Sequence, residues 1–135
     1  MSKIFLDTNF ILGLLLANDS THYKALKLKE TKKIFQNDCY ISNHVLDEII
    51  TLTSDKSDYD NVIKTYFMIK DNFTILNEYH ISNFNDKVMN TYYKFNNKLS
   101  FTDYSIIKVM KENNIKQIVT FDKEFKRCED IEIIT

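Results

Sequence analysis

The segment "KIFLDTNFIL", residues 3–12, joins a short apolar run to a carboxylate and then to a second apolar run. Ile4, Phe5 and Leu6 predict a short buried strand, and Asp7 stands directly at its end. An ionised carboxylate in such a place costs several kcal/mol to desolvate unless a partner compensates it. Asp7 therefore either caps the helix that follows or binds a cation.

The composition suits a single folded domain over residues 1–135. Apolar residues make up 44% of the 135 residues and charged residues 27%, which argues against disorder. The net charge of −1 counts against a protein that binds nucleic acid mainly through its overall charge. No apolar run approaches the roughly 18 residues of a membrane span, and no basic leader precedes an apolar core. We therefore expect a cytoplasmic protein.

Strand-like and helical segments alternate along the whole chain. Strands are expected at 4–7, 38–42, 73–76, 117–122 and 131–134, and helices at 8–19, 20–37, 43–54, 58–70, 82–97 and 102–113, with a helical turn at 123–127. This alternation predicts an α/β fold in which helices cover both faces of a central parallel sheet of four to five strands, a three-layer α/β/α sandwich. In the segment 20–37, the residues expected to face inward are Tyr23, Leu26, Ile34 and Phe35.

Four acidic residues come from four separate segments, and each has a purely structural explanation when taken alone. Asp7 and Asp122 follow predicted strands and could cap the helical segments after them. Asp103 could belong to a capping box that begins at Ser100. Glu48 could be a solvated helix residue.

The predicted topology nevertheless brings these four carboxylates together. Asp7 and Asp122 end strands, Glu48 lies one turn into a helix that follows a strand, and Asp103 begins a helix that leads back to the next strand. All four positions fall at the carboxyl edge of the sheet, where ligands bind in such folds. Like charges about 4 Å apart repel by roughly 4 kcal/mol at an effective dielectric of about 20. Such a cluster favours a divalent cation, and its oxygen ligands favour Mg²⁺ or Mn²⁺ over zinc.

In order and spacing, the acidic motifs resemble those of the PIN-domain ribonucleases, and most closely the toxin components of VapBC toxin–antitoxin pairs. "FLDTNFIL" resembles the family's opening strand and first acid, "VLDEII" the helix with the second, "LSFTDYSII" the third motif and "IVTFDKEF" the fourth. Glu48, rather than Asp47, takes the motif position. The resemblance runs from Ile4 to about Ile134. The chain departs from the family in having one glycine and no proline, which touches no motif acid.

The resemblance implies a PIN-like sandwich and a metal-dependent endoribonuclease. Such an enzyme cleaves RNA phosphodiester bonds with an activated water and leaves 5′-phosphate and 3′-hydroxyl ends. The residues expected to act in catalysis and to hold Mg²⁺ or Mn²⁺ are Asp7, Glu48, Asp103 and Asp122. RNA would be the substrate, and a separate small antitoxin protein would be the partner.

Residues beside the acids are given supporting roles. Thr8, Asn9 and Thr120 are expected to hydrogen-bond the carboxylates, although ordinary helix capping explains Thr8 or Asn9 about equally well. The basic residues expected to contact RNA phosphates follow Asp122: they are Lys123, Lys126 and Arg127. The histidines are expected to be surface or packing residues and not metal ligands: they are His22, His44 and His80.

We also expect a homodimer, because one small domain has more apolar helix residues than it can cover. The residues behind this expectation are Phe10, Leu14, Leu15, Tyr66 and Phe67.

Two other interpretations stay open at this point. The first is a phosphoryl-transfer domain of the receiver or haloacid-dehalogenase-like type, which also has an aspartate after its first strand. Asn9 stands where such a phosphatase needs a second acid, whereas Lys123 keeps some similarity to receivers. The second is a PIN-like module that binds RNA or a partner without cleaving anything. All four acids are present, so the sequence gives no sign that activity has been lost. Metal-dependent RNA cleavage would distinguish a nuclease from such a non-cleaving module.

Overall fold

The computed structural model describes residues 2–95 and 98–135, and within this part of the chain five strands form one parallel sheet. The strand order is β3-β2-β1-β4-β5. The strands are β1 (Lys3–Leu6), β2 (Asp38–Ser42), β3 (Thr74–Leu76), β4 (Gln117–Val119) and β5 (Glu132–Ile134). Strand β1 is central, with Ile4 paired to Cys39 of β2 and Phe5 paired to Ile118 of β4. With strands on both sides and helices on both faces, Ile4, Phe5 and Leu6 are buried, which explains this unbroken apolar run; Lys3, at the start of the strand, is exposed.

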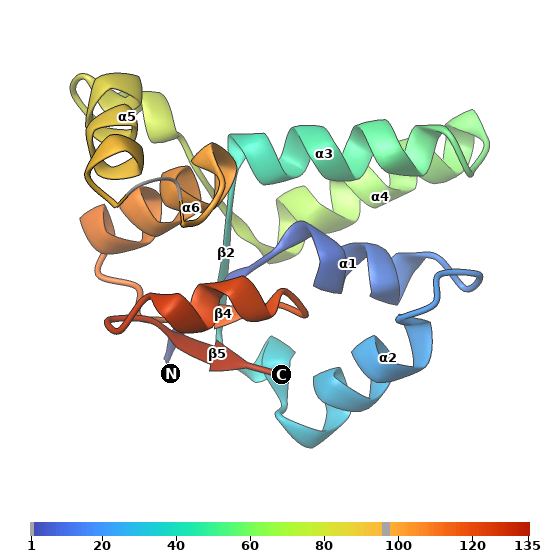
Figure 1. Ribbon diagram of the computed structural model, residues 1–135. Coiled ribbons are helices and arrows are strands. Elements are labelled where there is room, and N and C mark those ends of the chain that lie inside the picture. The colour runs from blue at the N-terminus through green and yellow to red at the C-terminus, as the bar shows by residue number, and fades with distance from the viewer. Residues whose placement is uncertain (1, 96–97) are drawn as a thin grey trace.

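Helices cover both faces of the sheet, which confirms the predicted three-layer α/β/α sandwich (Figure 1). The α-helices are α1 (Thr8–Leu15), α2 (His22–Thr31), α3 (Asn43–Ser54), α4 (Tyr59–Asn72), α5 (Phe84–Lys94) and α6 (Phe101–Glu112). Short 3₁₀ helices are η1 (Ile34–Gln36), η2 (Glu78–His80) and η3 (Lys123–Arg127). Helices α1 to α4 lie on one side of the sheet in Figure 1, and α5 and α6 lie on the other.

This division of the helices follows from the strand order. The chain moves outward from β1 to β2 and β3, and then returns across the sheet to β4 and β5. Because crossover connections between parallel strands are right-handed, reversing the direction moves the connecting helices to the opposite face. The reversal falls between β1 and β4, and such a switch point opens a crevice at the carboxyl ends of the two strands.

The single helix predicted for residues 20–37 is wrong. Helix α2 ends at Thr31, Lys33 adopts a left-handed conformation with φ of 49°, and a separate 3₁₀ turn follows. Ile34 is fully buried as expected, but Tyr23 is 85% exposed and Phe35 is 48% exposed. The inner face of α2 is formed by Ala25 and Leu28, and Tyr23 lies outside it.

Two other assignments need comment. Phe10, expected among the uncovered apolar residues, is fully buried, because α1 packs between α2 and α3. Tyr66 and Phe67 of α4 are exposed, as expected. The helix predicted for residues 82–97 begins at Phe84, and its last two residues, 96 and 97, lie outside the described residues. No helix in the described residues is long and apolar enough to cross a membrane.

Candidate active site at the carboxyl edge of the sheet

Asp7 both caps α1 and lies at the centre of the acidic edge. Its backbone N–H donates to the carbonyl of Val119 at 3.0 Å, so that it continues the pairing of β1 with β4. Its Oδ1 accepts the N–H of Thr8 at 2.8 Å, as an N-cap does. Its Oδ2 accepts the hydroxyl of Thr120 at 2.7 Å and a longer contact from the Asn9 amide at 3.5 Å. Capping and a place in the site are therefore not alternatives for this residue.

The environment of Asp7 disfavours the ionised form of its carboxylate. The residue is 9% exposed, and burial raises its pKa to about 6. Hydrogen bonds from Thr120 and Thr8 lower the pKa, while the negative charges of Asp103 and Glu48 raise it further. Two of the other predicted acids are thus near enough to change the pKa of Asp7.

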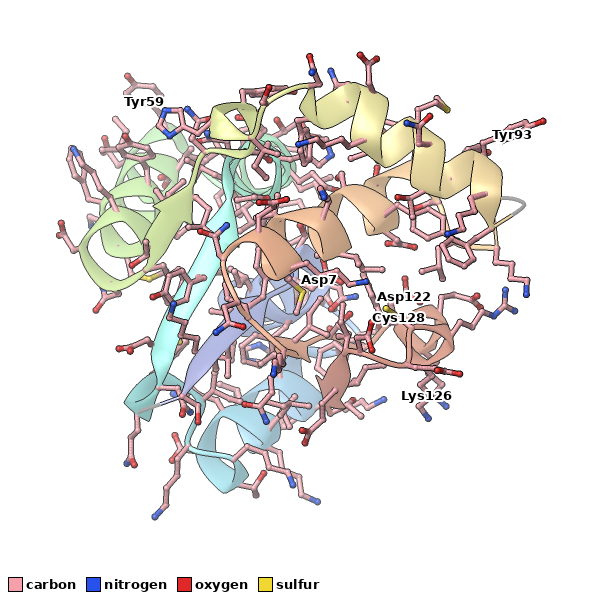
Figure 2. All side chains as sticks on the ribbon, turned by 90° about the vertical axis from the view of Figure 1, so that its left-hand side faces the viewer. Asp7, Tyr59, Tyr93, Asp122, Lys126 and Cys128 are labelled. Carbon is pink, nitrogen blue, oxygen red and sulfur yellow. The ribbon has the colours of Figure 1, made fainter. Side chains whose placement is uncertain are left out.

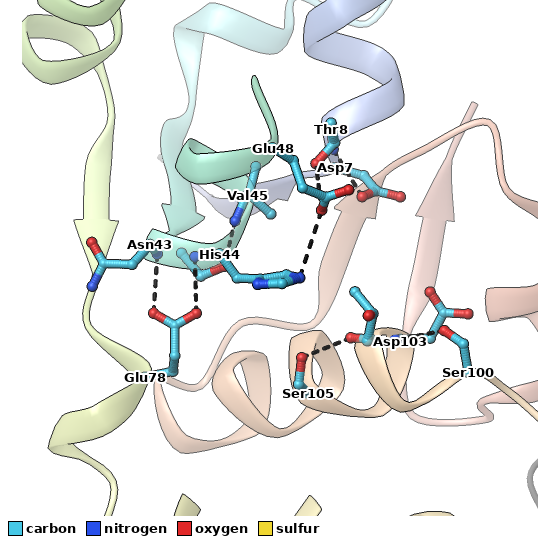
Figure 3. A network of polar contacts seen from close by, with 12 residues as sticks. Asp7, Thr8, Asn43, His44, Val45, Glu48, Glu78, Ser100, Asp103 and Ser105 are labelled. Atoms are coloured by element: carbon cyan, nitrogen blue, oxygen red, sulfur yellow. Dashed lines mark hydrogen bonds and ion pairs between the residues drawn. The ribbon is translucent and has the colours of Figure 1, made fainter. Parts of the chain in front are cut away.

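Glu48 is joined to Asp7 through Thr8. The hydroxyl of Thr8 donates to Glu48 Oε1 at 3.2 Å, while the backbone N–H of the same threonine donates to Asp7 (Figure 3). The ring of His44, one turn earlier on α3, has its Nε2 3.9 Å from Glu48 Oε1. The neighbouring Asp47 is exposed. The side chain of Glu48, not that of Asp47, therefore points to the acidic edge.

Asp103 and Asp122 form the other half of the cluster. Ser100 caps α6 by accepting the N–H of Asp103 at 3.0 Å, which matches the expected cap. Burial raises the pKa of Asp103, as do the charges of Asp122 and Glu124, whereas hydrogen bonds with Ser100 lower it. Asp122 caps η3 by accepting the N–H of Glu124 at 2.9 Å.

Thr120 is the hub of the hydrogen bonds around the acids. Its hydroxyl donates to Asp7 and accepts from the Asn9 amide at 3.2 Å and from the N–H of Asp122 at 3.0 Å. Asn9 in turn accepts the N–H of Phe121 at 3.1 Å. Thr8, Asn9 and Thr120, which the sequence assigns to support the carboxylates, all make such contacts, and their role in catalysis stays a prediction.

Within the described part of the chain, the ring of His44 near Glu48 is the only basic group in ion-pair range of the four acids, and no Lys or Arg forms an ion pair with any of them. Arg127 is held elsewhere, because its Nη1 donates to the carbonyl of Lys98 at 2.9 Å and its Nε pairs with Glu124 at 3.3 Å. Lys126 is exposed and projects outward from η3 in Figure 2, away from Asp122.

A family model for the PIN domain matches residues 4–131. The chain belongs to the PIN domain family. Among solved structures, VapC20 of Mycobacterium tuberculosis, described as a toxin that cleaves the sarcin–ricin loop, is 22% identical with a TM-score of 0.77, over 98% of this chain and 99% of that chain. A toxin–antitoxin complex from Klebsiella pneumoniae matches at 16% identity and a TM-score of 0.72, over 98% and 96%. VapBC2 of Rickettsia felis, bound to a promoter DNA fragment, matches at 18% and 0.66, over 97% and 96%. At identities this low, the structural similarity shows a shared fold and nothing more. No curated protein matches the chain significantly.

Membership in the PIN domain family sets aside the receiver-type interpretation. Receiver domains have the strand order 2-1-3-4-5, whereas the order in this PIN domain is β3-β2-β1-β4-β5. The similarity of Lys123 to a receiver lysine therefore has no structural support.

The donor set of this PIN domain suits Mg²⁺ or Mn²⁺ in kind, because it consists of carboxylates without cysteine. Burial, and to a smaller extent the neighbouring acids, raise the pKa of Asp7 and of Asp103, and a bound cation would act in the opposite direction. As they stand, however, no three His, Cys, Asp or Glu side chains in residues 2–95 and 98–135 converge as a group that could hold a metal ion. Glu48 and Asp122 are both partly exposed.

Two residues at this edge of the PIN domain were missed by sequence reasoning. His44, expected to be a surface or packing residue, is 50% exposed, but its contact with Glu48 was not foreseen. Glu78 is 4% exposed and bonds to the first turn of α3. A signal for Glu78 exists in the sequence, since it follows strand β3 by two residues, much as Asp7 and Asp122 follow β1 and β4.

Proposed function

We propose that this PIN domain is a metal-dependent endoribonuclease and the toxin of a toxin–antitoxin pair. The observation that supports the proposal is that carboxylates from four separate segments lie at one edge of the sheet. Asp7 is buried there, the charges of Asp103 and Glu48 raise its pKa, and no Lys or Arg in the described residues forms an ion pair with it. Unpaired buried charge destabilises a fold, so its presence indicates a use.

The carboxylates that would hold Mg²⁺ or Mn²⁺ are Asp7, Glu48, Asp103 and Asp122. Bound there, the ion would polarise the phosphoryl oxygens of RNA and lower the pKa of a coordinated water. The carboxylate of Asp7 or Asp103 would orient the attacking water. The hydrogen bonds from Thr8 and Thr120 fix the carboxylate of Asp7, so that it needs little reorganisation during the reaction. No side chain acts as a nucleophile, and the products carry 5′-phosphate and 3′-hydroxyl ends.

The partners proposed for this chain are RNA, a small antitoxin and a second copy of the chain. Lys123 and Lys126 of η3 are exposed and are available to RNA phosphates. Arg127 is proposed as a further contact, and to reach RNA it would have to leave the carbonyl of Lys98 and the carboxylate of Glu124. An antitoxin is supported by structural neighbours that are themselves described as toxin–antitoxin or VapBC complexes. A homodimer is supported by the exposed aromatic side chains of Tyr66 and Phe67 on α4.

Cleavage of total cellular RNA by the purified chain tests the proposal. Cleavage is expected with Mg²⁺ or Mn²⁺ and is expected to stop in EDTA and in Glu48→Gln. Asp47→Asn is the matched control, because it changes the adjacent, exposed acid on the same helix and should cleave like wild type. Sequencing the new RNA ends then identifies the target. Cleavage that persists in EDTA, or that is lost equally in both variants, would contradict the proposal.

A further inference from the structure

Glu78 is a buried carboxylate for which the proposed reaction has no use. It lies on η2, the turn that follows β3, and is 4% exposed. Its Oε1 accepts the N–H of Asn43 at 3.0 Å and its Oε2 accepts the N–H of His44 at 3.1 Å (Figure 3). Both oxygens of one side chain are therefore directed at the first turn of α3.

Helix α3 already has a cap of its own. Ser42 accepts the N–H of Val45 at 3.3 Å, which is the usual contact from an N-cap residue. Together, Ser42 and Glu78 satisfy the first three N–H groups of the helix, which otherwise lack partners within it. The charge of Glu78 is compensated by these two hydrogen bonds and by the positive end of the helix dipole.

The contact from Glu78 also joins distant parts of the chain. Asn43 and Glu78 are 35 positions apart, and Glu78 follows the strand that pairs with β2, the strand leading into α3. The carboxylate thus fixes the start of α3 against the end of the neighbouring strand. A local cap such as Ser42 cannot do this, because it moves with the helix.

Helix α3 carries Glu48 one turn beyond this anchor. Glu48 contacts the ring of His44, whose backbone N–H is held by Glu78, and accepts the hydroxyl of Thr8. Thr8 in turn donates its N–H to Asp7. A continuous series of contacts therefore runs from Glu78 to the centre of the acidic edge.

We infer that Glu78 is a positioning residue, which fixes the first turn of α3 and thereby sets the place of Glu48 relative to Asp7. The inference rests on the proposed function for its catalytic consequence, but the placement of Glu48 can be measured independently. Loss of a group that hydrogen-bonds a metal ligand typically lowers metal affinity 10- to 100-fold. Glu78 acts one contact further out, through the backbone of α3, so the low end of this range is expected.

The test uses Glu78→Gln, which keeps the size of the side chain but sets an amide N–H₂ against one backbone N–H. Its control is Asp58→Asn, which alters the carboxylate cap of α4, where Asp58 accepts the N–H of Asn61 at 2.9 Å. The Mg²⁺ concentration for half-maximal RNA cleavage should rise roughly tenfold in Glu78→Gln and stay unchanged in Asp58→Asn. If Glu78→Gln does not fold, Glu78→Asp, which keeps the charge but is shorter, takes its place and should show a smaller rise.

The second readout needs neither metal nor RNA. The ¹³C carboxyl resonance of Glu48, assigned by its loss in Glu48→Gln, should shift in metal-free Glu78→Gln and not in Asp58→Asn. A wild-type resonance together with a wild-type Mg²⁺ requirement would overturn the inference and leave Glu78 as a stabilising cap. If the wild-type protein cleaves no RNA, the proposed function fails, while the Glu48 resonance still decides the role of Glu78.

Discussion

The hydroxyl of Thr120 donates a 2.7 Å hydrogen bond to the carboxylate of Asp7, although the two residues are 113 positions apart in the chain. They meet because β1 and β4 are neighbours at the point where the strand order reverses. Thr120 is 1% exposed, so if its hydroxyl were removed, water could not easily take its place as the hydrogen-bond donor to Asp7. A change at Thr120 should therefore act on Asp7 directly.

Replacing Thr120 by valine should shift the pH dependence of RNA cleavage. The Thr120 hydrogen bond lowers the pKa of Asp7, so its removal should raise that pKa and move the acid limb of the rate profile to higher pH. Thr120→Ser keeps the hydroxyl and should restore the wild-type profile. The measurement is the rate of cleavage against pH at limiting Mg²⁺, where protons and Mg²⁺ compete for Asp7. An unshifted profile in Thr120→Val would show that the ionisation of Asp7 does not set the acid limb.

Asp7→Asn should abolish RNA cleavage and leave the protein folded. Asparagine caps a helix about as well as aspartate, so α1 should keep its start. The substitution nevertheless removes a charged ligand from the centre of the acidic edge. Cleavage assays at fixed Mg²⁺, with circular dichroism as the control for folding, test this. Wild-type cleavage by Asp7→Asn would show that the acidic edge is not the active site.

The contribution of Asp7 to the stability of the metal-free protein should fall as the pH rises from about 4 to about 6. Burial raises its pKa from the ordinary 3.8 to about 6, so in this range the folded state binds more protons than the unfolded chain. Stability then decreases with rising pH. Below this range both states are protonated and nothing is lost; above it the full loss, roughly 3 kcal/mol, is present.

Asp7→Asn isolates this contribution. In EDTA, the variant should be more stable than wild type at pH 7, and the difference should vanish near pH 3.5. Urea denaturation of both proteins across this pH range measures it. A constant difference at all pH values would mean that the pKa of Asp7 is not raised by folding.

Asp103→Asn should raise the melting temperature in EDTA. Burial and the charges of Asp122 and Glu124 raise the pKa of Asp103, so removing its charge should relieve repulsion, by about 0.5–2 kcal/mol for a site of this kind. Asp122→Asn should act in the same direction by relieving Asp103. Millimolar Mg²⁺ should raise the melting temperature of wild type by mass action, and that of both variants less.

Asp86→Asn is a matched control for Asp103→Asn. Asp86 and Asp103 each occupy the third position of a helix that begins with phenylalanine, but Asp86 is exposed on α5. If Asp103 served only the start of α6, both variants would melt lower than wild type, since an acid in the first turn of a helix is worth about 0.3–1 kcal/mol. Differential scanning fluorimetry in EDTA and in Mg²⁺ distinguishes the two outcomes.

The chain should form a homodimer through the exposed face of α4. Phe67 is 51% exposed and packs edge-on against Tyr66, with 5.4 Å between ring centroids. Phe67→Lys should give a monomer with little loss of stability, because the side chain is not part of the core. Tyr93→Lys is the control, since Tyr93 is 83% exposed on α5, in the opposite layer (Figure 2). Light scattering at micromolar concentration decides, and a monomeric wild type would contradict the prediction.

The sequence by itself determined the order of the elements and the four acids. The apolar run Ile4–Leu6 predicts a buried strand, and the acids stand at strand ends and helix starts that local patterns mark well. Parallel strands share one carboxyl edge, so even the meeting of the acids follows from topology. The periodicity of residues 20–37 wrongly predicted one continuous helix. The left-handed conformation at Lys33 breaks it, and no glycine at that position indicates such a turn in the sequence.

Only the tertiary structure decided which polar groups touch. Glu78 and the first turn of α3 are far apart in the chain, as are Thr120 and Asp7, and no local pattern pairs them. Secondary structure depends on neighbours a few positions away, which a sequence displays directly. Hydrogen bonds between segments depend on how helices and strands pack in three dimensions, and that is settled only when the whole core has formed.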